Sequence, residues 1–420
     1  MRWLLFLSGK SAWNRRGTLL PIVLSIAVSI VLLLGVEKIR TQVRDSFLQA
    51  VHGTDLIVGA RGGDVQLMLY AVFHLGSATH NMGWDSAKAI AAKENIAWSV
   101  PVSLGDSHRG HPVVATTPSF FSDYRVRRDK PLIFAAGRKF NDLFEVVIGS
   151  EVAKKQGYTA GKKIVLSHGS SGDNLPEHSD KPFVVSGVLS ATGTPVDRSL
   201  YISLEAMEAI HLDWQGGAVM PGLNITSSQV TKFNLEPKSI TALLVGLKKR
   251  TRVFALQREV NAWKHEPLMA IIPGVVIDQI WYLAGTGEQA LLLISLLVTL
   301  ASLAGLISVM LAGLGERRRE LAILRSAGAS LGDIVLLLLF EGIWLTVIGV
   351  LGGSFVFQLL LTCLGPTLLD SYGIMLELSL PGAGEWILLG CVGVAGVLSS
   401  LVPAIHAYRM SLADGLSVST

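Results

Sequence analysis

The chain has 420 residues, of which 50% are hydrophobic and 16% charged, and its mean hydropathy is +0.48. This composition is too apolar for an ordinary soluble protein and too polar for one that lies wholly within a bilayer. It predicts a membrane anchor with one sizeable soluble domain. The net charge of +4 is small, and its arginine clusters flank apolar runs, which argues against nucleic-acid binding. Cys363 and Cys391 lie in or beside apolar runs, so a disulfide framework is not expected.

The N-terminal region predicts a membrane anchor. Residues 1–17 are basic and carry two tryptophans, which is typical of an interfacial helix, although a disordered basic segment is the alternative. Residues 18–36 are apolar and long enough to span about 30 Å of hydrocarbon. Arg15 and Arg16 precede this run, so its start should face the cytoplasm. No small-residue cleavage site follows directly, so we interpret it as an uncleaved anchor that continues into a helical stalk over residues 37–51.

Residues 52–279 contain no stretch that could span a bilayer, and a second stalk follows at residues 280–289. Short β-branched runs alternate here with helical patterns, punctuated by Gly and Pro, which predicts an α+β domain. The expected strands are at 55–59, 113–117, 146–149, 164–167, 183–189, 199–202 and 240–246. The expected helices are at 150–156, 204–210 and 252–263.

Three further apolar runs predict membrane helices at 290–314, 334–363 and 386–405. The loop at 364–385 carries acidic residues but no Lys or Arg, so it should lie outside the cell, whereas Arg409 places the tail at 406–420 inside. The predicted fold is therefore a membrane protein with four transmembrane α-helices. A large α+β extracytoplasmic domain is inserted between the first and second spans.

Small residues recur four positions apart in two of the predicted spans. They are Ala301 and Gly305 in the second span, and Gly349 and Gly353 in the third. Such spacing lets helices approach closely in lipid, so we expect these residues to pack between two copies of the chain.

The predicted cytoplasmic loop at 315–333 contains a short amphipathic helix. At about 100° per residue, Glu316, Glu320, Ile323 and Leu324 share one side, and an adjoining side is basic. One interpretation is a basic loop that only fixes membrane orientation. The other is a docking helix for a cytoplasmic partner, because apolar side chains at helical spacing between charges suit a groove on another protein.

The order of residues within this loop favours docking. The string ERRRELAILRSAGA, Glu316–Ala329, resembles the cytoplasmic signature of the MacB/FtsX-like permeases of ABC transporters, in their four-span MacB-type branch. Two external segments, Asp55–Gly76 and Gly187–Met207, also resemble that family. The tail resembles the family's ending but lacks its usual second arginine and proline. The resemblance implies a coupling helix formed by Glu316, Arg317, Arg318, Arg319, Glu320, Leu321, Ile323, Leu324, Arg325, Gly328 and Ala329.

The resemblance also implies a function and a set of partners. It implies a permease subunit that couples ATP hydrolysis by a separate ATPase to conformational change of a periplasmic domain, for export or extraction of cargo. Two cytoplasmic ATPase copies, a second permease copy or close paralogue, membrane lipid and a periplasmic adaptor or substrate protein are the implied partners. The implied location is the bacterial inner membrane. Two alternatives stay open: a signalling subunit that regulates an extracytoplasmic enzyme, and a metal-linked membrane anchor without an ATPase.

The sequence contains no recognisable catalytic motif. Gly157–Lys163 lacks the spacing and the final hydroxyl of a phosphate-binding loop, and no nucleophile elbow or zinc-protease motif is present. We therefore expect a non-catalytic subunit with no cofactor of its own, whose partner ATPase holds ATP and Mg²⁺.

Two groups of ionisable residues are further candidate sites. Glu341 lies inside the third predicted span, where no other span has a matching charge, and a packing or interfacial role is favoured over a proton relay. His108 and His111 are the closest pair of histidines, with His74 and His80 nearby, but a structural metal site needs about four ligands in fixed geometry. The sequence prediction is therefore no metal site.

Overall fold

The computed structural model describes residues 9–10, 15–76, 78–126, 130–169, 176–215, 218–220, 225–227, 229–372 and 381–413. Most of the predicted interfacial helix, the middle of the 364–385 loop and the end of the tail therefore lie outside the described residues. The chain divides into two units. We call Arg44–Leu283 the external unit, and the rest, Met1–Val43 with Ala284–Thr420, the membrane unit.

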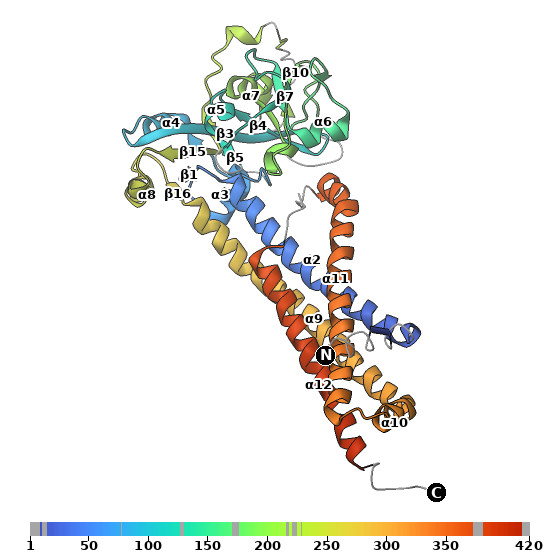
Figure 1. Ribbon diagram of the computed structural model, residues 1–420. Helices are drawn as coiled ribbons and strands as arrows, with labels where there is room; N and C mark the ends of the chain where they lie inside the picture. Colours follow the sequence, from blue (N-terminus) through green and yellow to red (C-terminus); the bar gives the residue numbers. More distant parts are fainter. Residues whose placement is uncertain are drawn as a thin grey trace. The chain divides into compact units, whose positions relative to one another are not determined.

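The membrane unit is built from long helices (Figure 1). They are α2 (Arg16–Ala50), α9 (Pro273–Glu316), α11 (Leu331–Tyr372) and α12 (Ala383–Ala413), with the short α10 (Arg318–Ser326) between two of them. Among the described residues, four stretches are long and apolar enough to cross a membrane: Arg16–Ala50, Gly285–Gly315, Leu331–Gly365 and Ala383–Arg409. Each contains one predicted span, which confirms the four-helix prediction.

Small and hydroxyl-bearing residues hold these helices together. Ser29 Oγ lies 2.9 Å from Thr299 Oγ1, so α2 and α9 share a buried hydrogen bond between hydroxyls. A Cβ added to Gly396 of α12 would lie 2.4 Å from Thr346 Cγ2 of α11, so only glycine permits this approach. Because lipid is as apolar as the side chains, such close packing and buried hydrogen bonds are what bring membrane helices together.

The external unit is an α+β domain around one mixed sheet in the order β16-β1-β15-β3-β4-β11-β8-β10-β7, with β9 on β10 (Figure 1). Its strands are β1 (Leu56–Ala60), β3 (Ile96–His108), β4 (His111–Thr116), β7 (Phe134–Gly137), β8 (Glu145–Ile148), β9 (Lys163–Ile164), β10 (Phe183–Leu189), β11 (Leu200–Ser203), β15 (Ala242–Leu247) and β16 (Leu268–Ile271). The pairs β4–β11 and β8–β10 are parallel, and the other pairs are antiparallel. The α+β prediction is therefore confirmed.

Smaller elements complete the unit. The helices are α3 (Asp64–Ala71), α4 (Trp84–Ala91), α5 (Phe120–Asp123), α6 (Ser150–Gln156), α7 (Leu204–His211) and α8 (Val253–Asn261). The short 3₁₀ turns are Pro195–Arg198, Val230–Lys232 and Arg250–Arg252. The short paired strands are β2 (Met82–Gly83) with β14 (Ser239–Ile240), β5 (Arg125–Val126) with β6 (Lys130–Pro131), and β12 (Trp214–Gln215) with β13 (Ala218–Val219).

Both faces of the sheet are buried, in two separate cores. Side chains alternate along each strand, so Leu56 and Val58 of β1 enter one core while Ile57 enters the other. The first core includes residues of α4, α6, α7 and α8, and the second includes residues of α3 and α5. The face to which a strand residue points therefore decides which helices it can meet.

Candidate functional site

The predicted coupling helix is a distinct element. Arg317 adopts φ −94° and ψ 0°, which ends α9 and starts α10. α10 ends at Ser326, and Gly328 has φ +98°, a left-handed conformation that glycine adopts without strain. Ser330 and Asp333 then exchange hydrogen bonds between side chain and backbone and open α11 as a capping box. Both ends of the coupling helix are thus defined by local interactions.

Arg317 is turned into the membrane unit instead of toward a cytoplasmic partner. Its guanidinium lies 2.5 Å from the carboxylate of Glu341 on α11, and the two residues are only 5% and 2% exposed. Arg317, predicted as a partner contact, is thus buried beside Glu341, and its role toward a partner stays a prediction. The charge that matches Glu341 comes from the loop and not from another span, which agrees with the favoured packing role. Removing one partner of such a buried pair strongly destabilises the protein, because the other charge stays buried without compensation.

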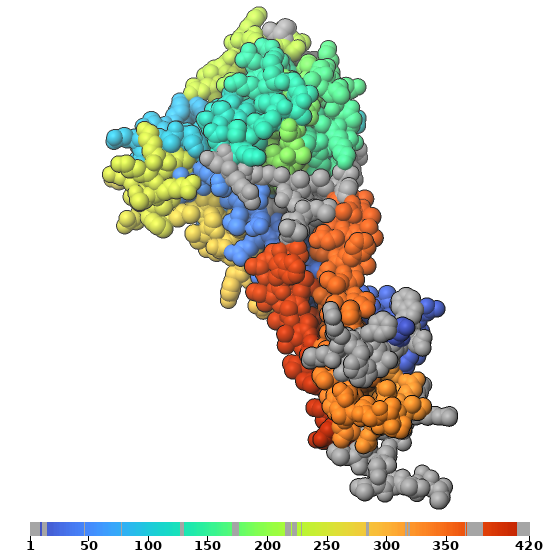
Figure 2. Space-filling view, viewed as in Figure 1, coloured from blue at the N-terminus to red at the C-terminus, as the bar shows by residue number. Residues whose placement is uncertain are grey.

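Other residues of α10 form an exposed face. Glu320 has a side chain 70% exposed, and Ile323 is 60% exposed although it is apolar. Arg325, Ala327 and Gly328 are exposed as well. Leu321 faces the other way, against an apolar cluster that includes Leu314, Ile334 and Ala404. Leu324 and Ala329 are half-buried, and the side chains of Glu316, Arg318 and Arg319 lie outside the described residues. Figure 2 shows α10 at the surface of the membrane unit.

The predicted small-residue pairs divide into two kinds. A Cβ on Gly349 would lie 2.6 Å from Ile26 Cγ2, and one on Gly353 would lie 2.7 Å from the carbonyl oxygen of Ala27. Both glycines of α11 thus pack against α2 of the same chain, which corrects their assignment to a contact between copies. A Cβ on Gly305 would meet nothing within 4 Å, and Ala301 is exposed. This face of α9 stays a predicted packing surface.

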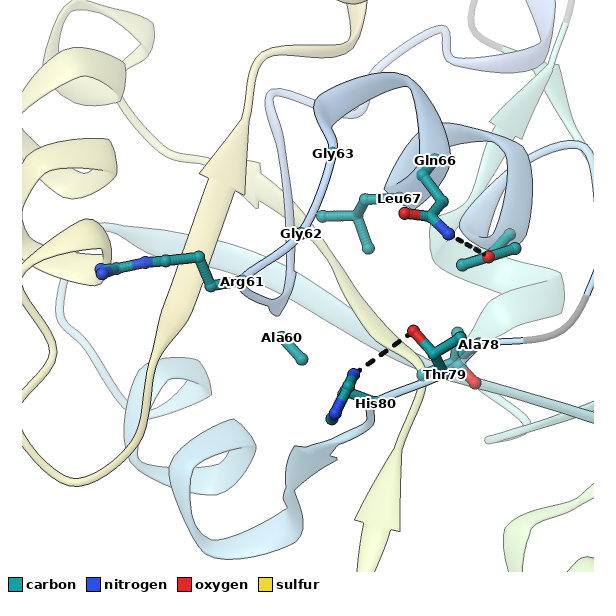
Figure 3. Close-up of a pocket in the computed structure, with 11 residues that line it drawn as sticks. Ala60, Arg61, Gly62, Gly63, Gln66, Leu67, Ala78, Thr79 and His80 are labelled. Carbon is teal, nitrogen blue, oxygen red and sulfur yellow. Dashed lines mark hydrogen bonds between the residues drawn. The ribbon is translucent and has the colours of Figure 1, made fainter.

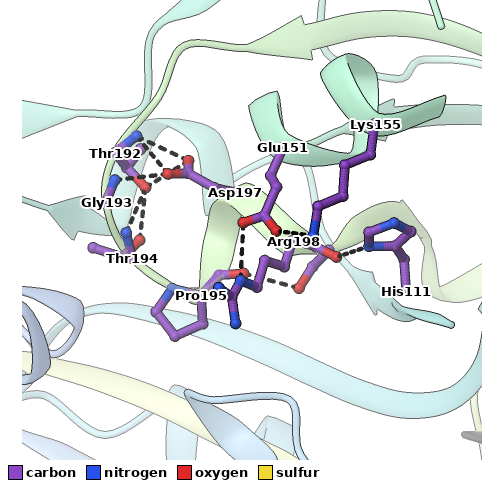
Figure 4. Close-up of polar contacts among 10 residues, drawn as sticks. His111, Glu151, Lys155, Thr192, Gly193, Thr194, Pro195, Asp197 and Arg198 are labelled. Carbon is purple, nitrogen blue, oxygen red and sulfur yellow. Dashed lines mark hydrogen bonds and ion pairs between the residues drawn. The ribbon is translucent and has the colours of Figure 1, made fainter. Parts of the chain in front are cut away.

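Of the two external segments that resemble the family, Gly187–Met207 contains a turn that is held by hydrogen bonds. The buried carboxylate of Asp197 accepts hydrogen bonds from the backbone N–H of Thr192 at 2.8 Å and that of Gly193 at 2.7 Å, and also from the Thr192 hydroxyl (Figure 4). Burial raises the pKa of Asp197 above its ordinary value, although these hydrogen bonds oppose the rise. Arg198 beside it donates to Glu151 of α6 at 2.9 Å. These contacts fix the turn onto α6.

A second family-like segment borders a small pocket (Figure 3). Its lining includes Arg61, Gly62, Gly63 and Gln66 after β1, with Thr79 and His80 opposite. Its volume of about 30 Å³ leaves room for roughly two water molecules.

The four histidines named in the sequence analysis make hydrogen bonds to different partners, although His108 and His111 face each other across the β3–β4 pair. His108 lies 2.6 Å from the carbonyl oxygen of Val165, and His111 lies 3.1 Å from that of Arg198. His74 is buried with Nδ1 2.8 Å from Ser199 Oγ, and His80 is exposed beside Thr79. Among the described residues these four do not converge.

A different set of side chains does converge in the external unit. Asp106, His168, His178 and His211 each offer one ligand atom, and these atoms lie within 4.8 Å of one another. The sequence prediction of no metal site rests on other histidines. The four residues come from three separate parts of the chain, so their spacing in the sequence does not indicate a site. The one signal in the sequence is that His168 and His178 both lie between β9 and β10.

Comparison with known families accounts for most of the chain. The family model "MacB-like periplasmic core domain" matches residues 17–262, and "FtsX-like permease C-terminal" matches residues 292–412. A search of the curated proteins finds no match.

Two solved structures are similar to the external unit. The periplasmic region of MacB from Actinobacillus actinomycetemcomitans is 12% identical with a TM-score of 0.34, over 56% of this chain and 97% of that one. The extracellular domain of the noncanonic ABC-type transporter YknZ from Gram-positive bacteria is 11% identical with a TM-score of 0.31, over 51% and 98%. The family models cover the external domain and the last three membrane helices in the expected order, and the chain belongs to the family of MacB/FtsX-like ABC transporter permeases.

Proposed function

We propose that this permease couples ATP hydrolysis on a separate cytoplasmic ATPase to conformational change of its external unit, and that the ATPase docks on α10. The observation that carries this proposal is the contrast between the two sides of α10. On one side Ile323 and Glu320 are exposed to solvent, whereas on the other side Arg317 and Leu321 contact the neighbouring helices. An exposed apolar side chain beside charges suits a groove on a partner protein.

The contacts of Arg317 and Leu321 with neighbouring helices give a route by which a docked partner can move the membrane helices. Arg317 joins the end of α9 to Glu341 of α11, and Leu321 packs on a cluster containing residues of α9, α11 and α12. A displacement of α10 is therefore passed to these helices and not absorbed by a loose loop. α2 and α9 each begin in one unit and end in the other, so they are the elements that can carry motion between units.

The polar groups of the membrane helices favour transmission of motion over an aqueous channel. The buried hydroxyls of Ser29 and Thr299 bond to each other, and Thr346 donates to the backbone carbonyl of Gly342. A channel needs polar groups that line a continuous water-filled route, whereas these three hydroxyls bond within the helix bundle. In α11, Ser354 Oγ and Gln358 Oε1 are buried without a hydrogen-bond partner. Cargo is therefore handled at or outside the membrane, in the bacterial inner membrane and periplasm. ATP and Mg²⁺ belong to the partner.

The substitution Ile323→Asp tests docking. Since Ile323 is exposed and lies outside the four candidate spans, the variant should insert and accumulate normally. Docking would bury its carboxylate against apolar surface, at a cost of several kcal/mol. ATPase copurification in mild detergent should therefore fall at least about tenfold, which corresponds to roughly 1.4 kcal/mol.

Ile323→Leu is the matched control, because it keeps an apolar side chain of similar size and should retain the ATPase. The purely topogenic interpretation predicts no effect in either variant, because every arginine remains. Wild-type copurification and ATP-dependent activity in Ile323→Asp would refute docking at this face. If the wild-type chain copurifies with no ATP-binding protein at all, the anchor without an ATPase becomes the better account.

A further inference from the structure

The cluster of Asp106, His168, His178 and His211 is assembled from three parts of the external unit. Asp106 lies near the end of β3, and His211 is the last residue of α7. His168 and His178 both lie in the stretch between β9 and β10. Asp106 Oδ1 lies 3.3 Å from His211 Nε2 and 3.4 Å from His168 Nδ1, and Asp106 Oδ2 lies 3.4 Å from His178 Nε2. One carboxylate is thus surrounded by three imidazoles.

An irregularity in β3 brings Asp106 to this place. Leu104 pairs with Val114, but the register shifts at the next residue, and Asp106 pairs with Val113. Leu104 and Val114 belong to one core, whereas Val113 belongs to the core that includes residues of α7. In a regular strand, residues two apart share a face, so Asp106 would otherwise point away from His211. The extra residue is a β-bulge, a feature that re-aims side chains at functional sites.

Backbone contacts fix both loop histidines. Ser107 and Ser167 exchange two backbone hydrogen bonds, which tie the loop to β3. The N–H of His168 donates to Pro176, and that of His178 donates to Leu166, both at 2.8 Å. Next to His178, the buried Lys181 binds Asp213, which lies two residues after His211. The cluster is therefore held in place by the fold.

Hydrogen bonding within the described residues does not account for the cluster. His178 is fully buried, yet neither of its ring nitrogens has a hydrogen-bond partner, and Asp106 Oδ2 also has none. A buried polar atom without a partner costs about 1–3 kcal/mol. Three such atoms lie in this one site, and His178 Nε2 and Asp106 Oδ2 are among the atoms that converge.

The spacing matches that of ligands around a tetrahedral metal ion. Metal–nitrogen distances of 2.0–2.1 Å and tetrahedral angles place neighbouring ligand atoms about 3.3–3.4 Å apart. His168 Nδ1 and His211 Nε2 have this spacing from Asp106 Oδ1, and His178 Nε2 has it from Asp106 Oδ2. His168 Nδ1 and His211 Nε2 are closer together, at a hydrogen-bond distance of 2.9 Å, and the four ligand atoms all lie within 4.8 Å of one another. We propose that Asp106, His168, His178 and His211 bind one divalent first-row transition metal ion of the zinc type. Three imidazoles and one carboxylate form a four-ligand set that suits Zn²⁺, whereas Ca²⁺ and Mg²⁺ prefer oxygen ligands.

The surroundings complete the site. His211 Nδ1 lies 2.8 Å from the carbonyl oxygen of Met207, which leaves Nε2 facing Asp106. The ring of Trp214 lies 4.6 Å from those of His168 and His178 and shields them. His168 and His211 are partly exposed, which gives an ion access.

The test is a zinc titration of the purified full-length chain, produced without a polyhistidine tag and stripped with a chelator. Competition with a chromophoric chelator should give one Zn²⁺ per chain, and Co²⁺ should give the intense visible absorption of a tetrahedral site. His178→Ala should weaken zinc binding by more than the roughly 10- to 100-fold typical of losing an outer-shell partner. His265→Ala, which removes an exposed histidine outside the cluster, should bind as the wild type does.

A second variant distinguishes the loss of a metal ligand from a folding defect. His168→Gln changes a partly exposed ligand, so the metal-free melting temperature should stay at the wild-type value while zinc affinity falls. Zinc should raise the melting temperature of the wild type and of His265→Ala, because it binds only the folded site. No stoichiometric Zn²⁺ in the wild type, or equal affinity in the wild type and His168→Gln, would overturn the proposal. This test does not depend on the ATPase, so its outcome leaves the proposed coupling untouched.

Discussion

Single residues fasten α10 to the other helices of the membrane unit. Arg317 and Glu341 are both buried and pair at 2.5 Å, while Glu320 contacts Arg317 from the exposed side at 3.7 Å. The sequence showed each charge but not the pair, because one residue was assigned to the loop and the other to a span. Their contact depends on α10 folding back at Arg317, a backbone feature with no sequence signature.

The pair predicts an asymmetric response to mutation. Glu341→Gln should leave the Arg317 charge uncompensated and destabilise the membrane unit by about 3–5 kcal/mol. The double variant Arg317→Met/Glu341→Leu should recover much of this loss, since it leaves no buried charge. Thermal unfolding in detergent measures both, with Glu320→Gln as an exposed control that should stay within about 0.5 kcal/mol. A double variant no more stable than Glu341→Gln would contradict the pairing.

His74 makes the external unit sensitive to acid. Burial lowers its pKa from 6.5 to about 4, so the folded chain resists a proton that the unfolded chain accepts. Stability is therefore fully present above pH 6.5 and falls as the pH drops toward 4, by up to about 3 kcal/mol. His74→Asn removes the titration, and asparagine tolerates the positive φ of 54° at this position. Urea unfolding at pH 7 and pH 5 should show a smaller loss in the variant. Equal losses would exclude His74 as the cause.

At the scale of elements, the sequence predicted those strands and helices whose positions depend on local residue patterns. Strands such as Phe183–Leu189 and helices such as Ser150–Gln156 lie where β-branched runs and helical patterns predicted them. β3 was missed although it is 13 residues long, because Pro101 and Gly105 interrupt its pattern. The sheet tolerates both, and the shift beside Gly105 is the irregularity that places Asp106. The cluster around Asp106 therefore could not be predicted without the sheet register.

The helix glycines give a matched pair of substitutions. Gly349→Leu should disrupt packing of α11 on α2 within one chain, at about 1–3 kcal/mol or more, because its Cβ meets Ile26. A Cβ added at Gly305 meets nothing within 4 Å, so Gly305→Leu should leave the melting temperature of the single chain unchanged. The same substitution should weaken crosslinking between two copies. Melting temperature and disulfide crosslinking distinguish the two effects. Unchanged crosslinking in Gly305→Leu would exclude this residue from the interface between copies.

At the scale of the whole molecule, each unit has a different task. The membrane unit presents α10, and the external unit holds a two-core sheet with a cluster of candidate metal ligands. The four-helix organisation could be predicted because apolar run length and arginine placement depend only on the bilayer. The identity of the cargo could not, because a binding surface is made of side chains that the fold brings together from separate elements.

The central claim is that α10 contacts an ATP-binding partner, and site-specific photocrosslinking tests it most directly. A photoreactive residue would replace Ile323, and, in a control chain, Phe254, which is exposed on the external unit. The crosslinked chains from intact membranes would be identified by mass spectrometry. The account predicts a cytoplasmic ATP-binding protein at position 323 and none at position 254. If position 323 yields no ATP-binding protein, or both positions yield the same one, the account of coupling through α10 is contradicted.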